Sequence, residues 1–497
     1  MRIRDALVPA LFIAGCQGDP GAASREVVDS AHILLSTRIG GRSREQGRDI
    51  AFLDDGDLVA TGSTTSADFP VSRGAWDTSF DSGSKVSDGW LVRVSPSGEP
   101  RWGSFLGSPN YERIYALEVD PAGDVVVAGR GGEGLPVGPA AAQPHFGGGT
   151  GKAYGPQDGF VCKLSPDGAS LRFCTYFGTD DNSIIRDVAV DSAGDIFIAA
   201  GSESGDFPAK WFSNALQPRR AGGEDIVVAK IAGDGSRVLW ATYLGGSGAE
   251  TGAPSIRIGP GGTPYVLITT KSGDMPTPAG FDHTLDGDMD LYVARLTPDG
   301  SRLLYGTYLG GSGNEDIETH GLAVDNEGVA YVGGGTSSLD FPTTPGAART
   351  ARDRSSDDPG DAFLAKISPD GSRLLAATYV GGRDREGGEG IGFDAEGNAY
   401  LTGGTRSPDF PTVTESDAGQ EEDLFAVKLS PDLSKVLFSI RLGGSRDDRG
   451  RALSVGRDGT MLITGTSQSE DWPLSHGRHQ QRRGADDAII VRLRPDR

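Results

Sequence analysis

Carboxylate side chains recur in this 497-residue chain at three fixed places of a repeated pattern. One set stands four residues after a Gly-Gly or similar pair: Glu45, Glu112, Glu250, Glu315, Glu386 and Asp448. A second set precedes an apolar residue and a proline: Asp68, Asp206, Asp274, Asp340, Asp409 and Asp471. A third set begins an apolar segment: Asp88, Asp158, Asp225, Asp290, Asp361, Asp423 and Asp487.

Two kinds of chemistry suit these acids. Oxygen-rich surroundings could bind a hard cation, which makes Ca²⁺ the one cofactor candidate in a chain otherwise expected to have none. A carboxylate that accepts backbone N–H groups could instead join one loop to the next in every repeat. Because function usually breaks a repeat whereas architecture preserves it, the sequence favours the structural role.

Aromatic residues differ from one repeat to the next in the segments that follow each proline. Five of them are candidates for contact with a ligand: Trp76, Tyr154, Trp211, Phe212 and Phe281. Aromatic rings among acidic residues suit a sugar polymer or a basic peptide. The alternative is that each ring packs its own loop onto the body of the repeat.

Catalytic signatures are absent from the sequence, which contains no HExxH, GxSxG or phosphate-binding P-loop motif. His476 and His479 have a spacing that a metal could use, but no third ligand stands near them in the sequence, and chance explains the spacing better. The favoured function is therefore binding, and the alternative is a hydrolase or lyase with acidic residues near the axis of the fold.

The elements that position these residues repeat seven times, at a spacing of about 62–72 residues. "ATYLGGSG" at 241–248 returns almost unchanged as "GTYLGGSG" at 306–313. Each unit has four short β-rich runs, joined in pairs by turns of the type "VDPAG" and "SPDG", in which Pro and Gly favour a type I turn. The sequence therefore predicts four-stranded antiparallel sheets, and 76 glycines agree with many tight turns.

Seven such sheets around an axis form an all-β seven-bladed β-propeller, an arrangement that protects the sheet edges. The chain opens on "HILLSTRIGG", a last-strand motif, and closes on "DAIIVRLRPD", a third-strand motif. The segment 32–39 is therefore predicted to pair beside 487–493, so that the N-terminal strand completes the C-terminal blade. Residues 32–497 form a single domain in this interpretation.

The units resemble the SBBP (seven-bladed β-propeller) repeat family. "DAFLAKISPDGSRLLAATYVGG" (361–382) and "GNAYLTGGTRSPDFP" (397–411) carry the resemblance most closely. It implies the propeller fold over residues 32–497 and an extracytoplasmic protein, and it implies little about activity.

The N-terminal residues differ from the repeats. "MRIR" is basic, "ALVPALFIA" is a short apolar run, and Ile13-Ala14-Gly15-Cys16 resembles a bacterial lipobox. Residues 1–15 are therefore predicted to be a lipoprotein signal peptide, Cys16 to carry lipid, and residues 16–31 to form a polar tether. Gln17 after the cysteine favours the outer membrane or cell surface, and the periplasm is the alternative.

Charge and loop length indicate where a ligand would bind. The net charge of −22 and the pI near 4.7 disfavour nucleic acid as a partner. One face of the propeller carries two tight turns per blade and should leave little room for a site. The other face carries the long, acidic loops, and we expect a protein or polysaccharide ligand to bind there.

Cys162 and Cys174 lie in the third and fourth predicted strands of the second unit, joined by "SPDG". Neighbouring antiparallel strands bring opposed Cα atoms within reach of a disulfide, and an exported protein keeps disulfides. Three other units have Ala at the first position and Ala or Gly at the second, so two free thiols that act as small core side chains are the alternative. The bridge is slightly favoured.

Overall fold

The structure is a computed structural model, and it describes residues 32–81, 86–148, 154–352, 360–412, 421–475 and 484–495. The predicted signal peptide, the tether, Cys16 and the pair His476 and His479 lie outside these residues. Within the described part of the chain, no helix has the length and apolar character needed to cross a membrane.

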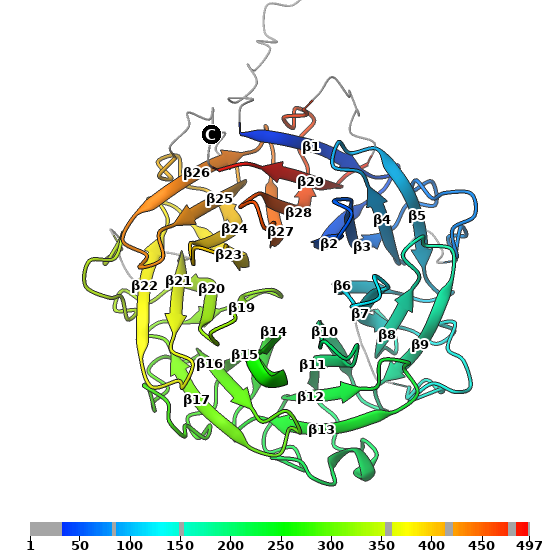
Figure 1. Ribbon diagram of the computed structural model, residues 1–497, viewed down its shortest axis with the longest axis horizontal. Coiled ribbons are helices and arrows are strands. Elements are labelled where there is room, and N and C mark those ends of the chain that lie inside the picture. The colour runs from blue at the N-terminus through cyan, green and yellow to red at the C-terminus, as the bar shows by residue number, and fades with distance from the viewer. Residues whose placement is uncertain are drawn as a thin grey trace, which may run out of the picture.

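The described strands form seven antiparallel sheets arranged as blades around one axis (Figure 1), as the repeats predicted. From blade 1 to blade 7, the innermost strands are β2 (Glu45–Phe52), β6 (Arg113–Val119), β10 (Ser183–Val190), β14 (Glu250–Gly259), β18 (Glu315–Asp316) with β19 (Leu322–Val324), β23 (Glu386–Phe393) and β27 (Asp448–Val455). The second strands are β3 (Leu58–Thr64), β7 (Val125–Gly131), β11 (Ile196–Ser202), β15 (Thr263–Thr270), β20 (Ala330–Thr336), β24 (Ala399–Thr405) and β28 (Met461–Ser467).

The outer half of each blade has the same regularity. The third strands are β4 (Asp88–Val94), β8 (Asp158–Leu164), β12 (Asp225–Ile231), β16 (Asp290–Leu296), β21 (Asp361–Ile367), β25 (Asp423–Leu429) and β29 (Asp487–Leu493). The outermost strands are β5 (Pro100–Leu106), β9 (Leu171–Phe177), β13 (Val238–Leu244), β17 (Leu303–Leu309), β22 (Leu374–Val380), β26 (Val436–Leu442) and β1 (Ile33–Ile39). Two short 3₁₀ helices, η1 (Ala209–Phe212) and η2 (Pro260–Gly262), complete the described elements.

The predicted closure of the ring is confirmed. β1 pairs antiparallel with β29, and the two strands lie side by side at the top of Figure 1 in blue and red. Ser36 fastens the closure further, because its backbone N–H donates to Ser475 Oγ (2.8 Å) and its hydroxyl accepts from Trp472 Nε1 (2.9 Å). Blade 7 is thus built from both ends of the described chain.

The blades hold together through seven clusters of buried apolar side chains in the described chain, and each cluster joins two adjacent blades. The "SPDG" turns take part in this packing. Gly371 ends such a turn with a φ of +74°, and a Cβ there would come within 2.3 Å of the Tyr305 ring in the preceding blade. Leu433 occupies the equivalent place in blade 6 with a φ of +56°, and its fully buried side chain belongs to the cluster between blades 5 and 6.

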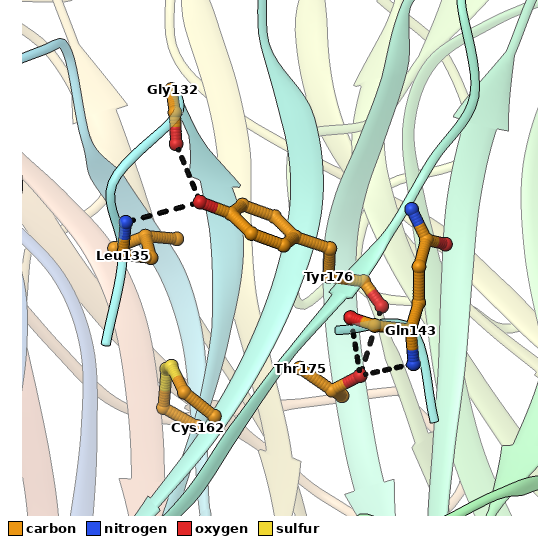
Figure 2. The surroundings of a disulfide bond; sticks show 7 residues. Gly132, Leu135, Gln143, Cys162, Thr175 and Tyr176 are labelled. Atoms are coloured by element: carbon orange, nitrogen blue, oxygen red, sulfur yellow. Dashed lines mark hydrogen bonds between the residues drawn. A yellow bond between two sulfur atoms is a disulfide. The ribbon is translucent and has the colours of Figure 1, made fainter. Parts of the chain in front are cut away.

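The "TY" pair of the repeated motif anchors the loop between the second and third strands. In blade 2 the hydroxyl of Tyr176 donates to Gly132 O (3.1 Å) and accepts from Leu135 N (3.0 Å), as Figure 2 shows. Thr175 Oγ1 accepts from Gln143 N at 3.0 Å on the same loop. Long loops are therefore fixed to the outer strand.

Blade 6 replaces the motif tyrosine with arginine and keeps the anchor. Arg441 Nη1 donates to Ser407 O (2.8 Å), and its Nε lies 2.7 Å from Asp423 Oδ2. Arg38 donates to Ser469 O in the same way in blade 7, so a charged side chain does in these two blades what a phenol does in blades 2 to 5.

Candidate functional site

The repeated acids at the start of the innermost strands are buried and hydrogen-bonded. All six are at most 2 % exposed. In blade 6, Glu386 accepts from Thr405 Oγ1 (2.7 Å) and from the backbone N–H of Gly382 (3.1 Å). In blade 5, Glu315 makes the equivalent bonds to Thr336 Oγ1 (2.5 Å) and Gly311 N (3.0 Å).

Burial also changes the acidity of these groups. It raises the pKa of Glu45, Glu315 and Glu386 to about 7, and the neighbouring aspartate that begins a third strand adds to the shift. Burial raises the pKa of Glu112 to about 8 in the same way. The pKa values of Glu250 and Asp448 are raised as well. A large part of this set is therefore uncharged near neutral pH.

The glycine pair of "TYLGG" lies against these carboxyl groups. A Cβ on Gly310 would lie 2.4 Å from the carboxyl carbon of Asp290 and 2.6 Å from Glu315 Oε2. A Cβ on Gly311, the second glycine, would lie 2.7 Å from Asp340 Oδ1. The pair is thus required by close approach of the backbone to three acids.

The acids that precede the apolar-proline pair have one shared role. Asp340 Oδ1 accepts from the backbone N–H of Ser312 at 2.8 Å. Four other members of this set accept in the same way, from the backbone N–H groups of residues 42, 247, 383 and 445: Asp68, Asp274, Asp409 and Asp471. The acids that begin the third strands also accept from loop backbone, as Asp225 does from Ala221 N (2.8 Å). The geometry supports the structural role for these acids.

A cation site requires several carboxylates that converge on one point. In the described residues, no group of three or more His, Cys, Asp or Glu side chains has such an arrangement.

Five innermost strands carry a second repeated device that the sequence analysis missed, a β-bulge three residues after the first residue of the strand. In five blades the register between the first and second strands slips by one residue there, which leaves one residue unpaired. The unpaired residues, called here the bulge set, are Arg48, Tyr115, Arg186, Glu389 and Arg451. Bulges re-aim side chains and are common beside functional sites.

A glycine in the second strand marks the bulge in four of these blades. A Cβ on Gly403 would lie 1.8 Å from the carbonyl oxygen of Gly387, on the facing strand. The same collision, at 1.8–2.0 Å, would occur at Gly62, Gly129 and Gly465. The glycine that ends "VDxxGxxYVTG" is therefore the signal that could have located the bulges. In blade 3, Ala200 takes this place.

Blades 4 and 5 interrupt the ring of bulges with longer irregular segments. In β14, residues 252–254 lie outside the ladder with β15. In blade 5, residues 317–321 separate β18 from β19. The inner edge therefore repeats its backbone in five blades and departs from it in two adjacent ones.

Four arginines surround one tyrosine of the bulge set. The guanidinium carbons of Arg186, Arg48, Arg113 and Arg130 lie 4.5, 5.7, 5.8 and 5.8 Å from the centre of the Tyr115 ring. They come from three blades, since Arg48 belongs to β2, Arg113 and Arg130 to blade 2, and Arg186 to β10. We call these five residues the arginine cluster.

The arginine cluster extends to two further tyrosines on the loop side of blade 2. Tyr154 stacks on Tyr111 with the ring centres 4.5 Å apart, and Arg130 lies 4.8 Å from the Tyr154 ring. Tyr154 is 50 % exposed, whereas Tyr111 is buried. One candidate aromatic residue is thus at the surface, beside the cluster.

Two acids of the inner edge, Glu318 in blade 5 and Glu389 in blade 6, are paired with arginines. Glu389 is 2.5 Å from Arg449 Nε and 3.2 Å from Arg451 Nη1. Glu318 lies 3.8 Å from Arg451. Burial opposes ionisation of Glu318, but Arg451 and other nearby arginines lower its pKa overall. Glu318 and Glu389 thus lie in blades 5 and 6, whereas the arginine cluster lies in blades 1 to 3.

His320 joins blades at the axis. Its Nε2 lies 3.7 Å from Asp49 of blade 1, and its Nδ1 lies 3.8 Å from Asp187 of blade 3 and 3.4 Å from Arg257 of blade 4. Its carbonyl oxygen accepts from Ile391 N of blade 6 at 3.2 Å. His320 has a φ of +78°, a strained backbone region for a residue with a side chain. This strain is held in place by contacts to four blades.

The other candidate aromatic residues pack onto the fold. Trp211 and Phe212 are 5 and 6 % exposed and belong to the cluster between blades 2 and 3. Trp76 and Phe281 are half-buried against the clusters of their own blades. The structure therefore places these four in the packing role that was the alternative, and it leaves Tyr154 exposed.

The tight-turn face has more room than its short turns predicted, and this expectation was wrong. A cavity of about 720 Å³ lies there, lined by the ends of inner strands and by turns of blades 7, 1, 2 and 3. Phe52, Glu118, Val190 and Arg457 are among its lining residues. Short turns do not reach across the axis, so the space between them stays open.

Cys162 and Cys174 face each other across β8 and β9, with their Cα atoms 4.1 Å apart and their sulfur atoms joined as a disulfide in the structure. Both are buried in the cluster between blades 1 and 2. Blade 5 has Ala365 opposite Ala377 at the same register. Whether the purified protein contains the bridge is a prediction taken up below.

Comparison with known proteins supports the fold. A family model for the SBBP β-propeller repeat matches residues 304–342, which run from β17 to the loop after β20. The regulatory protein FlaEY of Caulobacter vibrioides is 24 % identical over 348 residues, covering 66 % of this chain and 34 % of that protein. This chain therefore aligns with about a third of that relative.

Two solved structures are similar at low scores. One is a protein of unknown function from Dyadobacter fermentans (TM-score 0.42, 11 % identity, 93 % of this chain and 99 % of that chain). The other is the polysaccharide lyase Uly1 (TM-score 0.44, 10 % identity, 90 % of each chain). At these scores the likeness carries no argument about activity. The chain thus carries a match to the SBBP β-propeller repeat at residues 304–342, and its described strands form a seven-bladed β-propeller.

Proposed function

We propose that this protein is an exported, lipid-anchored scaffold that binds a protein or polysaccharide ligand through the loop-bearing face of its propeller. One observation carries the proposal. The backbone of the inner edge repeats from blade to blade at the bulges, yet the side chains of the bulge set differ in size and charge. A frame that repeats and side chains that vary are typical of a binding surface on a rigid scaffold.

The ligand would contact the varied residues rather than the repeated acids. Most of the acids are buried or committed to backbone N–H groups, as Glu386 and Asp340 are. The same commitment disfavours the alternative of a hydrolase or lyase that uses these acids, because a catalytic carboxyl must reach its substrate. The relative in Caulobacter vibrioides is named a regulatory protein, and regulation by a scaffold requires binding alone.

The binding face can be tested by blocking one face at a time. Ser312→Cys places a thiol on the loop-bearing side of blade 5, and Glu327→Cys places one on its tight-turn side, both at exposed positions. Each purified variant is coupled to polyethylene glycol and applied to a panel of immobilised bacterial polysaccharides and envelope proteins. We expect the polymer at residue 312, and not at residue 327, to abolish retention. If only the polymer at residue 327 abolishes retention of the protein on the immobilised ligands, the proposed binding face is wrong.

The anchor is tested separately. Cys16→Ala removes the predicted site of lipidation, and we expect the protein to move from the membrane fraction to the soluble fraction. Unchanged fractionation would reject the lipobox interpretation. Protease treatment of intact cells that express the unaltered protein then distinguishes the cell surface from the periplasm.

A further inference from the structure

We infer that the arginine cluster is an anion-binding site, and that its ligand is a carboxylated sugar chain such as a uronic-acid polymer. This inference rests on the proposed binding function, to which it adds a site and a chemical class of ligand.

The four arginines lack the carboxylate partners that other arginines of this protein have, although Arg48 donates to Gln46 Oε1 (2.8 Å) and Arg130 to the Tyr111 hydroxyl (3.4 Å). Arg257, Arg441 and Arg449 each lie 2.5–2.7 Å from a carboxylate oxygen. In the described part of the chain, no carboxylate lies within ion-pair distance of an arginine of the cluster. This is unexpected in a chain with 69 acidic and 47 basic residues, where acids are available to pair almost any arginine.

Burial makes the missing partners costly. Arg130 is 9 % exposed, and the buried Nε atoms of Arg48, Arg113 and Arg130 have no hydrogen-bond partner in the described structure. A buried donor without a partner destabilises the fold, and the cost is higher for a charged group. Burial and the positive charges of Arg451 and Arg113 lower the pKa of Arg48 to about 9. A bound anion would satisfy these donors and offset the repulsion.

Nearby acids do not replace such an anion. Arg186 acts on Glu224 to lower its pKa, but burial and the neighbouring Glu203 keep that pKa raised to about 7. Burial opposes ionisation of Glu318, but Arg451, Arg48 and Arg186 help to lower its pKa; within the described residues it lies within ion-pair distance of Arg451 and of no arginine of the cluster. At the centre of the cluster, burial alone would raise the pKa of Tyr115, yet the arginines lower it overall. The local charge is therefore positive although the protein as a whole is acidic.

The geometry of the cluster selects the kind of anion. An arginine stacked on an aromatic ring keeps its edge N–H groups for hydrogen bonds in the plane of the guanidinium, where a carboxylate is bound by two parallel bonds. Three tyrosine rings, of Tyr111, Tyr115 and Tyr154, provide this stacking. A carboxylate fits such donors well.

The exposed ring of Tyr154 favours a sugar as the part of the ligand that lies outside the arginine cluster. Its exposed ring continues the stack that begins at Tyr111 and borders Arg130, so a ligand whose acid group enters the cluster would lay its body on this ring. The apolar face of a sugar ring packs on an aromatic face, whereas an acidic peptide offers no matching flat surface at regular spacing.

The test compares one sugar with and without its charge. Titration calorimetry measures binding of oligogalacturonate, of its methyl ester, of oligomannuronate and of a poly-glutamate peptide to the full-length protein. We expect at least one of the two acidic oligosaccharides to bind, with an affinity that falls as salt is added, and the neutral ester not to bind. Equal binding of the ester, or no binding of either acidic oligosaccharide, would overturn the inference.

Variants identify the site. Arg186→Gln and Arg113→Gln should each weaken binding at least tenfold, and Tyr154→Ala should weaken it several-fold. Arg172→Gln is the matched control, because Arg172 pairs with Asp124 away from the cluster and should leave the affinity unchanged. Thermal unfolding confirms that each variant is folded. Binding that survives both cluster substitutions would overturn the assignment.

The outcomes also separate this inference from the proposed function. If poly-glutamate binds as tightly as the sugar and depends equally on Arg186, the site is anionic but its ligand class is wrong. If a neutral glycan or a protein binds the loop-bearing face without need of these arginines, the inference fails while the scaffold function stands. Loss of binding only when the tight-turn face is blocked would refute the scaffold proposal itself.

Discussion

Two positions on each innermost strand, three residues apart, follow opposite rules. The first is an acid in six blades, buried and hydrogen-bonded in place. The second is the bulge position, occupied by arginine, tyrosine or glutamate according to the blade. Both stand on the same backbone, so the difference lies in what each side chain meets. The acid meets its own loop, whereas the bulge residue meets residues of other blades around the axis.

This difference shows how a repeat protein separates stability from recognition. A side chain that forms hydrogen bonds within its own repeat has the same structural role in every repeat, so the same residue type is kept. A side chain that faces the axis is seen by the other blades, and a change there alters one shared surface at little cost to its own blade. If this is right, substitutions at the acid position should lower stability, whereas substitutions at the bulge position should change binding and leave stability almost unchanged.

The largest effect is expected from the glycine that makes room for a bulge. Gly403→Ala would bring a Cβ within 1.8 Å of the Gly387 carbonyl oxygen, and strand β23 would have to move. We expect a loss of at least about 3 kcal/mol in the free energy of unfolding, measured by thermal or denaturant unfolding. Gly205→Ala is the control, because a Cβ there meets nothing within 4 Å. Equal stabilities of the two variants would mean that the bulge is not held by this contact.

The next effect concerns the acid itself. Glu386→Ala leaves the hydroxyl of Thr405 and the N–H of Gly382 without their acceptor in a buried place. We expect a loss of about 2–3 kcal/mol in unfolding free energy. Glu327→Ala removes an exposed glutamate from a turn of blade 5 and should change stability little. If both variants unfold alike, the acid position is not structural and the comparison fails.

Cys162 and Cys174, in the outer half of blade 2, test whether residues that contact their own blade contribute to stability. Cys162→Ala with Cys174→Ala reproduces the alanine pair that blade 5 has at this register. If the bridge is present, the double variant should lose about 2 kcal/mol, since closing so short a loop constrains the unfolded chain only moderately. Mass spectrometry of the unreduced, alkylated protein decides the matter first. Two alkylated thiols at these positions would show that no bridge exists.

The repeated acids should also make stability depend on pH. Burial raises the pKa of Glu386 from 4.5 to about 7. Because the folded value lies above the unfolded one, its contribution is full below about pH 4.5 and is lost as the pH rises through 7. We expect a higher melting temperature at pH 5.5 than at pH 8, and a smaller difference in Glu386→Gln. A melting temperature that rises between these pH values would contradict the assignment.

The smallest effect on stability is expected at the bulge position. Arg186→Gln removes one of four like charges that surround Tyr115, and it breaks no ion pair within the described residues. We expect the unfolding free energy to stay within about 0.5 kcal/mol of the parent or to rise slightly. The measurement is thermal unfolding in low salt, where repulsion is strongest. A large loss of unfolding free energy would show that Arg186 has a structural role instead of a binding role.

The fold could be predicted from the sequence because its signals are local and repeated. Turn residues such as Pro166 and Gly168 mark hairpins wherever they occur, and seven copies leave little doubt about the architecture. The pairing of β1 with β29 followed from two incomplete motifs. The acids were found in the same way, because a repeated residue is visible in a single sequence.

The arginine cluster could not be found by that method. Arg48, Arg113 and Arg186 are far apart in the sequence and do not repeat, and they meet only because three inner strands converge on the axis. The positions of Arg48 and Arg186 also depend on β-bulges, in which the register between two strands shifts by one residue. Burial is not visible in a single sequence either, and the repeated acids Glu45 and Glu315 of this face are buried.

Closure of the ring depends on the order in which the strands are synthesised, because β1 pairs with β29. His32 and Arg494 are hydrogen-bonded although 462 positions separate them. Strand β1 is made early and must wait, unpaired, until β29 emerges. A chain that stops early leaves open sheet edges at both ends of the ring, and such edges pair with other chains or attract chaperones and proteases. The joint between the two ends thus serves as a check on completeness, passed only by a chain whose last strand has been made.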